Sequence, residues 1–157
     1  LAVLQPERPR GEEFMRAVRA LDPELSVVVA YGQILKPEVL ELPEQGSINV
    51  HASLLPELRG AAPIHWAIMR GYAESGVTIM RMVQELDAGP MLYQVREPIG
   101  PDETASELSH RLSVIGATFW RWNRWAGGSL SYGNATYVPG RSLKNSKPQD
   151  LLTAALP

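Results

Sequence analysis

The sequence predicts an α/β fold in which helices flank a mostly parallel sheet. Residues 27–29 are three consecutive valines, and an apolar, β-branched stretch of this kind is typical of a strand buried on both faces. Residues 11–21 carry apolar side chains at the spacing of one helical face. Strand-like and helix-like segments alternate up to about residue 117, and that order predicts parallel strands joined by right-handed crossovers.

Local signals set the bounds of the expected elements. Pro98 near the end of residues 91–99 predicts a strand at the edge of the sheet. Thr104 followed by Glu107 is the signature of a capping box at the start of a helix. In chain order we expect a helix over 11–21, a strand over 26–31, a short helix over 37–42, a strand over 47–51, a helix over 62–69, strands over 77–82 and 91–99, and a capped helix whose apolar face is Leu108, Leu112 and Ile115.

Composition changes near residue 118, where we expect a boundary. Residues 1–117 form the predicted α/β unit, and residues 118–157 form a tryptophan-rich segment followed by a basic, linker-like tail. Residues 1–110 have a formal charge of −7, whereas residues 111–157 have +5. This basic tail is either an electrostatic footprint for nucleic acid or a solvated tail that happens to be basic.

The bulk composition is ordinary for a globular protein. The 157 residues are 45% hydrophobic and 20% charged, which is enough for one core. Without cysteine there is neither a disulfide framework nor a thiolate nucleophile, which fits a reducing, cytoplasmic location. No apolar run approaches the roughly 20 residues of a membrane span, and no glycine-rich phosphate loop is present. The start, without methionine, is expected to be a cut within a domain.

Catalytic potential is concentrated at the end of the strand predicted over residues 47–51. Asn49 and His51 are two residues apart, so in a strand their side chains leave the same face. Histidine can take up a proton near neutral pH, and an asparagine amide can stabilise a developing oxyanion. This chemistry suits acyl transfer or hydrolysis. Residues 86–90 are expected to form a turn with a carboxylate, Asp87, at its entrance. The three scattered histidines predict no metal site.

Several segments, in order, resemble one family. They are Val-Val-Ala-Tyr-Gly-Gln-Ile-Leu at 28–35, Asn-Val-His-Ala-Ser-Leu-Leu-Pro at 49–56, Arg-Gly-Ala-Ala-Pro-Ile at 59–64, Gly-Val-Thr-Ile-Met-Arg-Met at 76–82 and Leu-Asp-Ala-Gly-Pro-Met-Leu at 86–92. Residues 1–117 thereby resemble the catalytic domain of methionyl-tRNA formyltransferases, within the wider group of enzymes that use 10-formyltetrahydrofolate. The resemblance implies a Rossmann-like fold that here lacks the first strands of the family's domain and its C-terminal barrel.

The resemblance also implies roles for particular residues. By it, the reaction moves a formyl group from 10-formyltetrahydrofolate, a co-substrate, to the amino group of initiator methionyl-tRNA, with no metal. Ala88 stands where threonine is common in the family, which is a minor departure. The implied catalytic residues are Asn49, His51 and Asp87; the implied folate contacts are Ser53, Leu54, Leu55 and Pro56, and, around the pterin, Tyr31, Gly32, Ile34, Leu35, Val83 and Glu85.

Three alternatives stay open at this point. The acceptor could be another amine, such as an amino-sugar nucleotide. Water could replace the amine, which would make the protein a formyltetrahydrofolate hydrolase. The chain could also be an inactive fragment that only binds folate or tRNA. The segment Arg-Gly-Ala-Ala-Pro favours the transferase, whereas the missing strands favour the inactive fragment.

Overall fold

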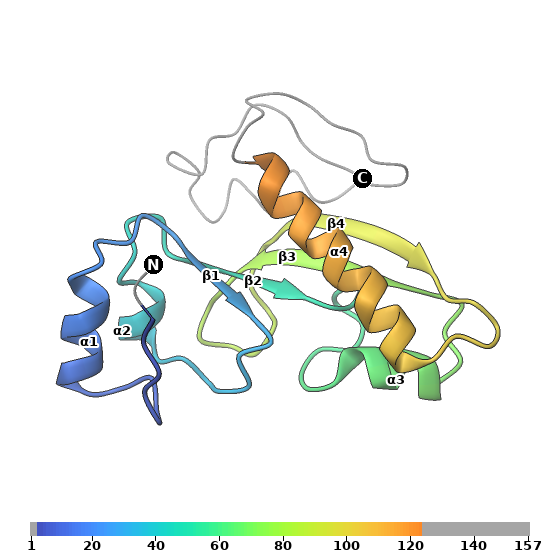
Figure 1. Ribbon diagram of the computed structural model, residues 1–157, viewed down its shortest axis with the longest axis horizontal. Coiled ribbons are helices and arrows are strands. Elements are labelled where there is room, and N and C mark those ends of the chain that lie inside the picture. The colour runs from blue at the N-terminus through green and yellow to red at the C-terminus, as the bar shows by residue number, and fades with distance from the viewer. Residues whose placement is uncertain (1–2, 124–157) are drawn as a thin grey trace.

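The structure is a computed structural model that describes residues 3–123, with side chains up to residue 117 (Figure 1). Helices and strands alternate at first, and two strands then follow one another directly. The elements are α1 (Glu12–Arg19), β1 (Ser26–Val29), α2 (Pro37–Leu40), β2 (Ser47–His51), α3 (Pro63–Met69), β3 (Glu74–Arg81), β4 (Met91–Pro98) and α4 (Ala105–Asn123). Each expected helix and strand is present with slightly different ends, and the α/β class is confirmed.

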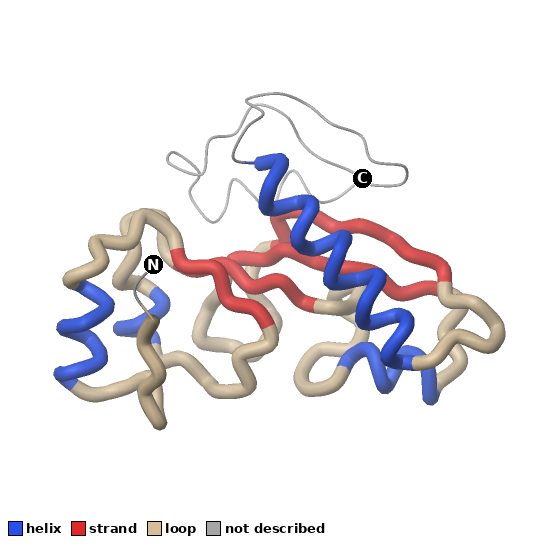
Figure 2. Tube along the Cα trace, in the orientation of Figure 1, coloured by secondary structure: helices blue, strands red, loops and turns tan. Residues whose placement is uncertain are grey.

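The sheet is mixed in its strand directions. Its strands lie together as one layer, red in Figure 2, in the order β1-β2-β3-β4, and β1 and β2 are parallel. The pairs β2–β3 and β3–β4 are antiparallel, so among the described strands the parallel arrangement is confined to one pair. The physical reason lies in the connections. Loop 82–90 is too short for a crossover, and β3 begins at the end of the sheet where β2 finishes.

The core lies between the sheet and α4, which crosses one of its faces (Figure 1). Leu108 and Leu112 of α4 are buried, and Ile115 packs against the same cluster, as the sequence predicted. From the sheet, Ile48, Val77 and Ile79 point toward them. Side chains alternate between the two faces of the sheet along β2. Ile48 faces α4, so its neighbours on β2 face away from α4.

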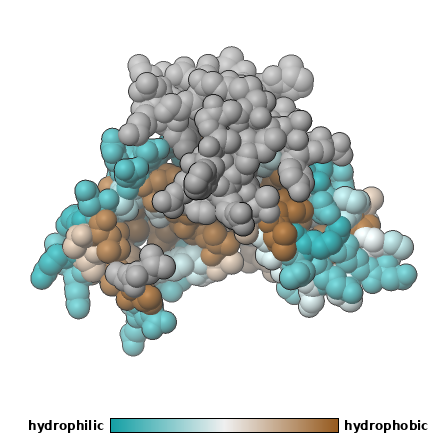
Figure 3. All heavy atoms as spheres, turned by 45° about the horizontal axis from the view of Figure 1, so that its top comes forward, coloured by the Kyte–Doolittle hydropathy of each residue, from teal (hydrophilic) through white to brown (hydrophobic). Residues whose placement is uncertain are grey.

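Strand β1 is less buried than its sequence suggested. It ends at Val29, and this valine is 59% exposed, whereas three consecutive valines predicted a strand covered on both faces. Within the described residues β1 stands at one edge of the sheet, and β4 stands at the other edge, as predicted. Figure 3 shows hydrophobic surface in the middle of the molecule and hydrophilic surface toward both ends. The described residues therefore bury β1 less than its run of apolar residues predicts.

The boundary predicted near residue 118 falls inside a helix, because α4 continues to Asn123. The first residues of the tryptophan-rich segment continue this helix, whereas residues 124–157, with the basic tail, lie outside the described residues. The division of the chain at this point therefore stays a prediction. None of the described helices is both long enough and apolar enough to cross a membrane.

The capping box predicted at the start of α4 is present. The backbone N–H and the hydroxyl of Thr104 donate hydrogen bonds to the Glu107 carboxylate, at 2.9 and 2.7 Å. In return, the Thr104 hydroxyl accepts one from the Glu107 N–H at 3.3 Å. These bonds, the backbone one first, lower the pKa of Glu107. Two N–H groups at the helix start are thereby satisfied.

Replacing Thr104 with alanine is expected to lower the free energy of unfolding by about 1 kcal/mol, because the cap is lost. Urea unfolding followed by circular dichroism measures the difference, and Thr104→Ser should restore most of it. The folded-state pKa of Glu107 is lowered, so its contribution is present above the unfolded pKa and is lost as the pH falls through the folded value. The difference in the free energy of unfolding between the wild type and Thr104→Ala should therefore become smaller in acid. An unchanged difference would mean that the carboxylate contributes nothing to the cap.

Candidate active site

Strand β2 presents Asn49 and His51 on the face of the sheet that is turned away from α4. Asn49 lies opposite Met80 and His51 lies opposite Thr78 in the antiparallel register with β3. Val50, between them, packs against the core under α4. The predicted common orientation of the two polar side chains follows from this register. They lie near the carboxyl end of β2, beside the carboxyl end of its parallel neighbour β1.

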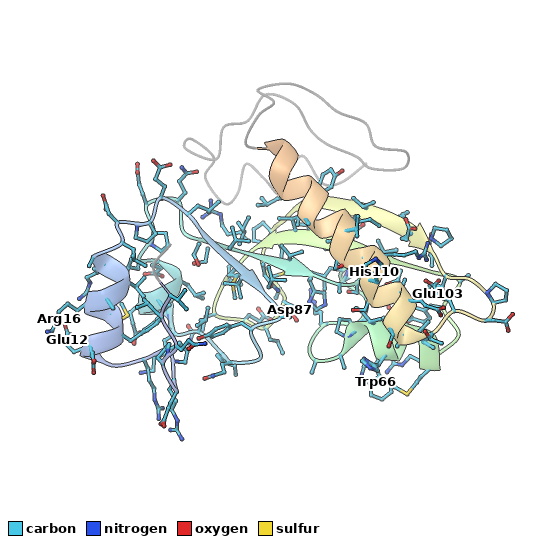
Figure 4. All side chains as sticks on the ribbon, in the orientation of Figure 1. Glu12, Arg16, Trp66, Asp87, Glu103 and His110 are labelled. Carbon is cyan, nitrogen blue, oxygen red and sulfur yellow. The ribbon has the colours of Figure 1, made fainter. Side chains whose placement is uncertain are left out.

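Loop 82–90 brings Asp87 to His51. The Asp87 Oδ2 atom is 3.7 Å from His51 Nδ1, and both side chains are about nine-tenths buried, with exposed fractions of 11% and 7%. The same oxygen accepts a hydrogen bond from the Gly60 backbone N–H at 2.8 Å. Figure 4 shows Asp87 close to the ends of β1 and β2. Two residues that are far apart in sequence therefore meet in a largely water-excluded place.

A backbone carbonyl binds the other nitrogen of the imidazole. His51 Nε2 is 3.0 Å from the Leu58 carbonyl oxygen. A carbonyl only accepts hydrogen bonds, so Nε2 carries a proton and donates it. Nδ1 is then the nitrogen that faces the Asp87 carboxylate. A protonated imidazole would meet an acceptor oxygen at each nitrogen, which is a geometry that stabilises its positive charge.

Several backbone conformations in the loops around this site are uncommon. Leu58, Ala62 and Asp87 have φ angles of 56°, 55° and 47°, in the left-handed region that residues other than glycine seldom occupy. Such residues persist only where surrounding contacts hold them, and they concentrate at functional sites. Leu58 and Asp87 both contact His51, so two of the residues with this uncommon φ angle are those that hold the imidazole in place.

The side-chain amide of Asn49, unlike the imidazole of His51, has no hydrogen-bond partner among the described residues. Asn49 is half-buried. A partly desolvated amide without a protein partner can donate to a ligand oxygen at little cost. The site thus combines a fixed imidazole–carboxylate pair with a free amide donor on the same face of β2.

The residues expected to contact folate fall into two groups. Ser53 and Leu55 are buried, and the Ser53 hydroxyl donates to the Glu57 carbonyl at 2.6 Å. Leu54 lies close to Gly76 of β3, whereas Pro56 is exposed. The other group lies in the loops after β1 and β3: Tyr31, Ile34 and Val83 are exposed at 43%, 85% and 40%, Gly32 and Glu85 are exposed, and Leu35 is half-buried. The exposed apolar side chains offer surface to a ligand; their contact with folate stays a prediction.

The remaining histidines are separate from this site. Figure 4 places His110 on α4 and Trp66 on α3, both apart from Asp87. His65, next to Trp66, and His110 are exposed. Among the described residues no three histidine, cysteine, aspartate or glutamate side chains are grouped so that they could hold a metal ion. Sequence reasoning missed the Leu58 carbonyl and the Gly60 N–H, because backbone groups leave no signal in side-chain chemistry.

Comparison with known proteins decides the family. The sequence model of the family described as "Formyl transferase" matches residues 2–119. The chain belongs to the formyl transferase family. Over 117 residues this chain is 51% identical to the methionyl-tRNA formyltransferase of Geobacter metallireducens, and 56% identical to that of Halorhodospira halophila. Each match covers 74% of this chain but only 38% and 37% of the respective relative, so the chain spans less than two fifths of their length.

Solved structures of related enzymes share the fold of this chain. Phosphoribosylglycinamide formyltransferase from Bacillus halodurans matches with a TM-score of 0.64 at 25% identity, over 69% of this chain and 56% of that one. A formyltetrahydrofolate deformylase from Pseudomonas syringae matches with a TM-score of 0.61 at 29% identity, over 69% of this chain and 38% of that one. These likenesses confirm the predicted Rossmann-like fold, of which this chain spans part. They also show that transferases and a deformylase share it.

Proposed function

We propose that this protein moves the formyl group of 10-formyltetrahydrofolate to the α-amino group of methionyl-initiator-tRNA. The observation that carries the proposal is the buried His51–Asp87 pair beside the free Asn49 amide. This arrangement occurs in a chain about half identical to proteins named methionyl-tRNA formyltransferase. The proposal also places the protein in the cytoplasm, with tRNA and a folate as its partners.

The chemistry of the proposed reaction matches the groups at the site. The neutral amine attacks the formyl carbon, a new C–N bond forms, and the carbonyl oxygen becomes an oxyanion. The bond between the formyl carbon and N10 of the folate then breaks, and the proton lost by the amine ends on N10. A positioned amide such as that of Asn49 can donate to the oxyanion, and a donor of this kind contributes about 3–4 kcal/mol in comparable sites.

The role of His51 follows from its two partners. Nε2 donates to the Leu58 carbonyl, and Nδ1 faces the Asp87 carboxylate. A proton taken up from the attacking amine at Nδ1 would be held between the imidazole and Asp87. The resulting imidazolium would stabilise the neighbouring oxyanion by its charge, because the site is largely closed to water. Asp87 orients the ring and balances that charge, as the third group of a catalytic triad does.

The hydrolase is the second candidate, and a specific observation favours it. A deformylase shares the fold at 29% identity, and water could take the place of the amine in the same geometry. Transfer to another amine, such as an amino-sugar nucleotide, uses the same groups with a different acceptor. The inactive fragment is the remaining alternative, because the chain spans only 38% of the relative from Geobacter.

One assay separates these candidates. The 157-residue chain is incubated with 10-formyltetrahydrofolate and methionyl-tRNA, and formylmethionyl-tRNA and tetrahydrofolate are quantified in the same sample. We expect the two products in equal amounts, and Asp87→Asn should abolish both. Tetrahydrofolate without formylated tRNA would contradict the proposal in favour of hydrolysis, because water is then the acceptor of the formyl group. If neither forms while the chain is folded, the proposal is wrong, and repeating the assay with an amino-sugar nucleotide separates another acceptor from the inactive fragment.

A further inference from the structure

A fully buried hydroxyl lies beside the candidate site, on the same face of the sheet as His51. Thr78 of β3 is opposite His51 in the sheet, and its exposed fraction is 0%. The Thr78 hydroxyl donates to the Ser53 carbonyl at 2.6 Å and accepts from the Leu55 N–H at 3.1 Å. Both partners belong to the loop that follows His51. The buried side chain of β3 therefore holds this loop against the sheet at two backbone positions.

Gln94 of β4 extends the same arrangement across the sheet. It lies opposite Thr78, and its amide nitrogen donates to the Thr78 hydroxyl and to the Leu55 carbonyl, each at 3.0 Å. His51, Thr78 and Gln94 thus form one row on one face of three neighbouring strands. A buried network whose members are all satisfied fixes one arrangement, because breaking any bond leaves a desolvated polar group.

The loop transmits this anchoring to the imidazole. The Ser53 hydroxyl donates to the Glu57 carbonyl at 2.6 Å, and the next residue is Leu58, whose carbonyl receives the His51 Nε2 proton. At its far end the loop is held by the Gly60 N–H bond to Asp87. The position of the Leu58 carbonyl therefore depends on contacts at both ends of the loop.

We propose that Thr78 and Gln94 are positioning residues that hold loop 53–58, so that the Leu58 carbonyl keeps the proton of neutral His51 on Nε2. Neither side chain reaches the reacting atoms, because Thr78 is fully buried and Gln94 points to Thr78 and Leu55. They act through the loop. Their effect on turnover rests on the proposed function, whereas their effect on the imidazole does not.

The direct test observes the tautomer of His51. Long-range proton–nitrogen NMR spectra, recorded at a pH where the imidazole is neutral, show which ring nitrogen carries the proton, and His51→Ala identifies the signal among the three histidines. We expect the Nε2–H form in the wild type and a mixture of both tautomers in Thr78→Val, which keeps the shape of the side chain but removes its hydrogen bonds. Thr78→Ser, which keeps the hydroxyl, should restore the Nε2–H form.

Turnover provides the second readout. With the loop displaced, kcat is expected to fall by up to about 100-fold in Thr78→Val, with little change in KM for the folate, because misplacement near a reacting group has effects of this size. Gln94→Met removes two hydrogen bonds from the less buried end of the network and should shift both readouts in the same direction. If Thr78→Val does not fold, Gln94→Met decides the question.

The matched control is Arg96→Gln, on the same strand as Gln94. Arg96 forms an exposed ion pair with Glu74 and takes no part in the network, so both readouts should stay at the wild-type value. Wild-type tautomer populations in folded Thr78→Val and Gln94→Met would overturn the proposal, whatever their activity. If the wild type makes no product, the proposed function fails, and the tautomer measurement still decides the role of Thr78 and Gln94.

Discussion

Removing the Asn49 amide or the His51 imidazole is expected to lower formyl transfer by about 100- to 1000-fold or more, while folate binding is retained. Asn49→Ala removes the proposed hydrogen-bond donor to the oxyanion, an amide that no described protein group binds. Removing one such donor typically lowers kcat by a factor of this size. For His51→Ala the proton acceptor in front of Asp87 disappears. Initial rates of formylmethionyl-tRNA formation give kcat, and fluorescence titration gives the folate Kd.

The chain supplies matched controls for this prediction. His65 and His110 are exposed and lie outside the site, so His65→Ala and His110→Ala should keep wild-type rates. Because His51 is buried, its variant needs a folding check by circular dichroism before its rate is interpreted. Full turnover in a folded Asn49→Ala or His51→Ala protein would show that the catalytic residues have been assigned wrongly. Loss of folate binding together with turnover would instead indicate a role in binding.

Sequence periodicity could predict one half of the site and not the other. The common orientation of Asn49 and His51 follows from the two-residue repeat of a strand, which is a local property. The approach of Asp87 to His51 depends on how loop 82–90 folds back over the end of the sheet. No spacing rule predicts such a contact, so it entered through the resemblance of the surrounding motifs.

The same distinction between local and long-range information applies to the sheet. The capping box at Thr104 needs only residues three apart, and the structure has it as predicted. Strand direction is set by how the connecting segments cross, and loop 82–90 returns the chain antiparallel to β3. The burial predicted for β1 was wrong, because cover depends on what stands beside a strand. Val29 is apolar in sequence yet 59% exposed among the described residues.

Gly89→Ala is expected to be the most damaging single-methyl change near the site. A Cβ atom at residue 89 would lie 1.8 Å from the carbonyl oxygen of Arg81 and 2.9 Å from its carbonyl carbon, both backbone atoms that cannot rotate away. The Arg81 N–H also donates to the Pro90 carbonyl at 2.9 Å, which keeps the two segments together. Either that bond breaks or loop 82–90 moves outward, at a cost of about 1–3 kcal/mol in folding stability.

The displacement would reach the proposed catalytic pair, because Asp87 is two residues away and its carboxylate depends on the 2.8 Å bond from the Gly60 N–H. We therefore expect kcat to fall by about 100-fold, on the scale that misplacement of a catalytic group produces. Gly100→Ala is the control: its Cβ would be 3.6 Å from the nearest atom, an ordinary contact, and it should leave stability and rate nearly unchanged. Rates per folded molecule, from activity and urea unfolding at one temperature, separate the two effects. A normal rate per folded molecule in Gly89→Ala would mean that the loop moves without taking Asp87 from His51.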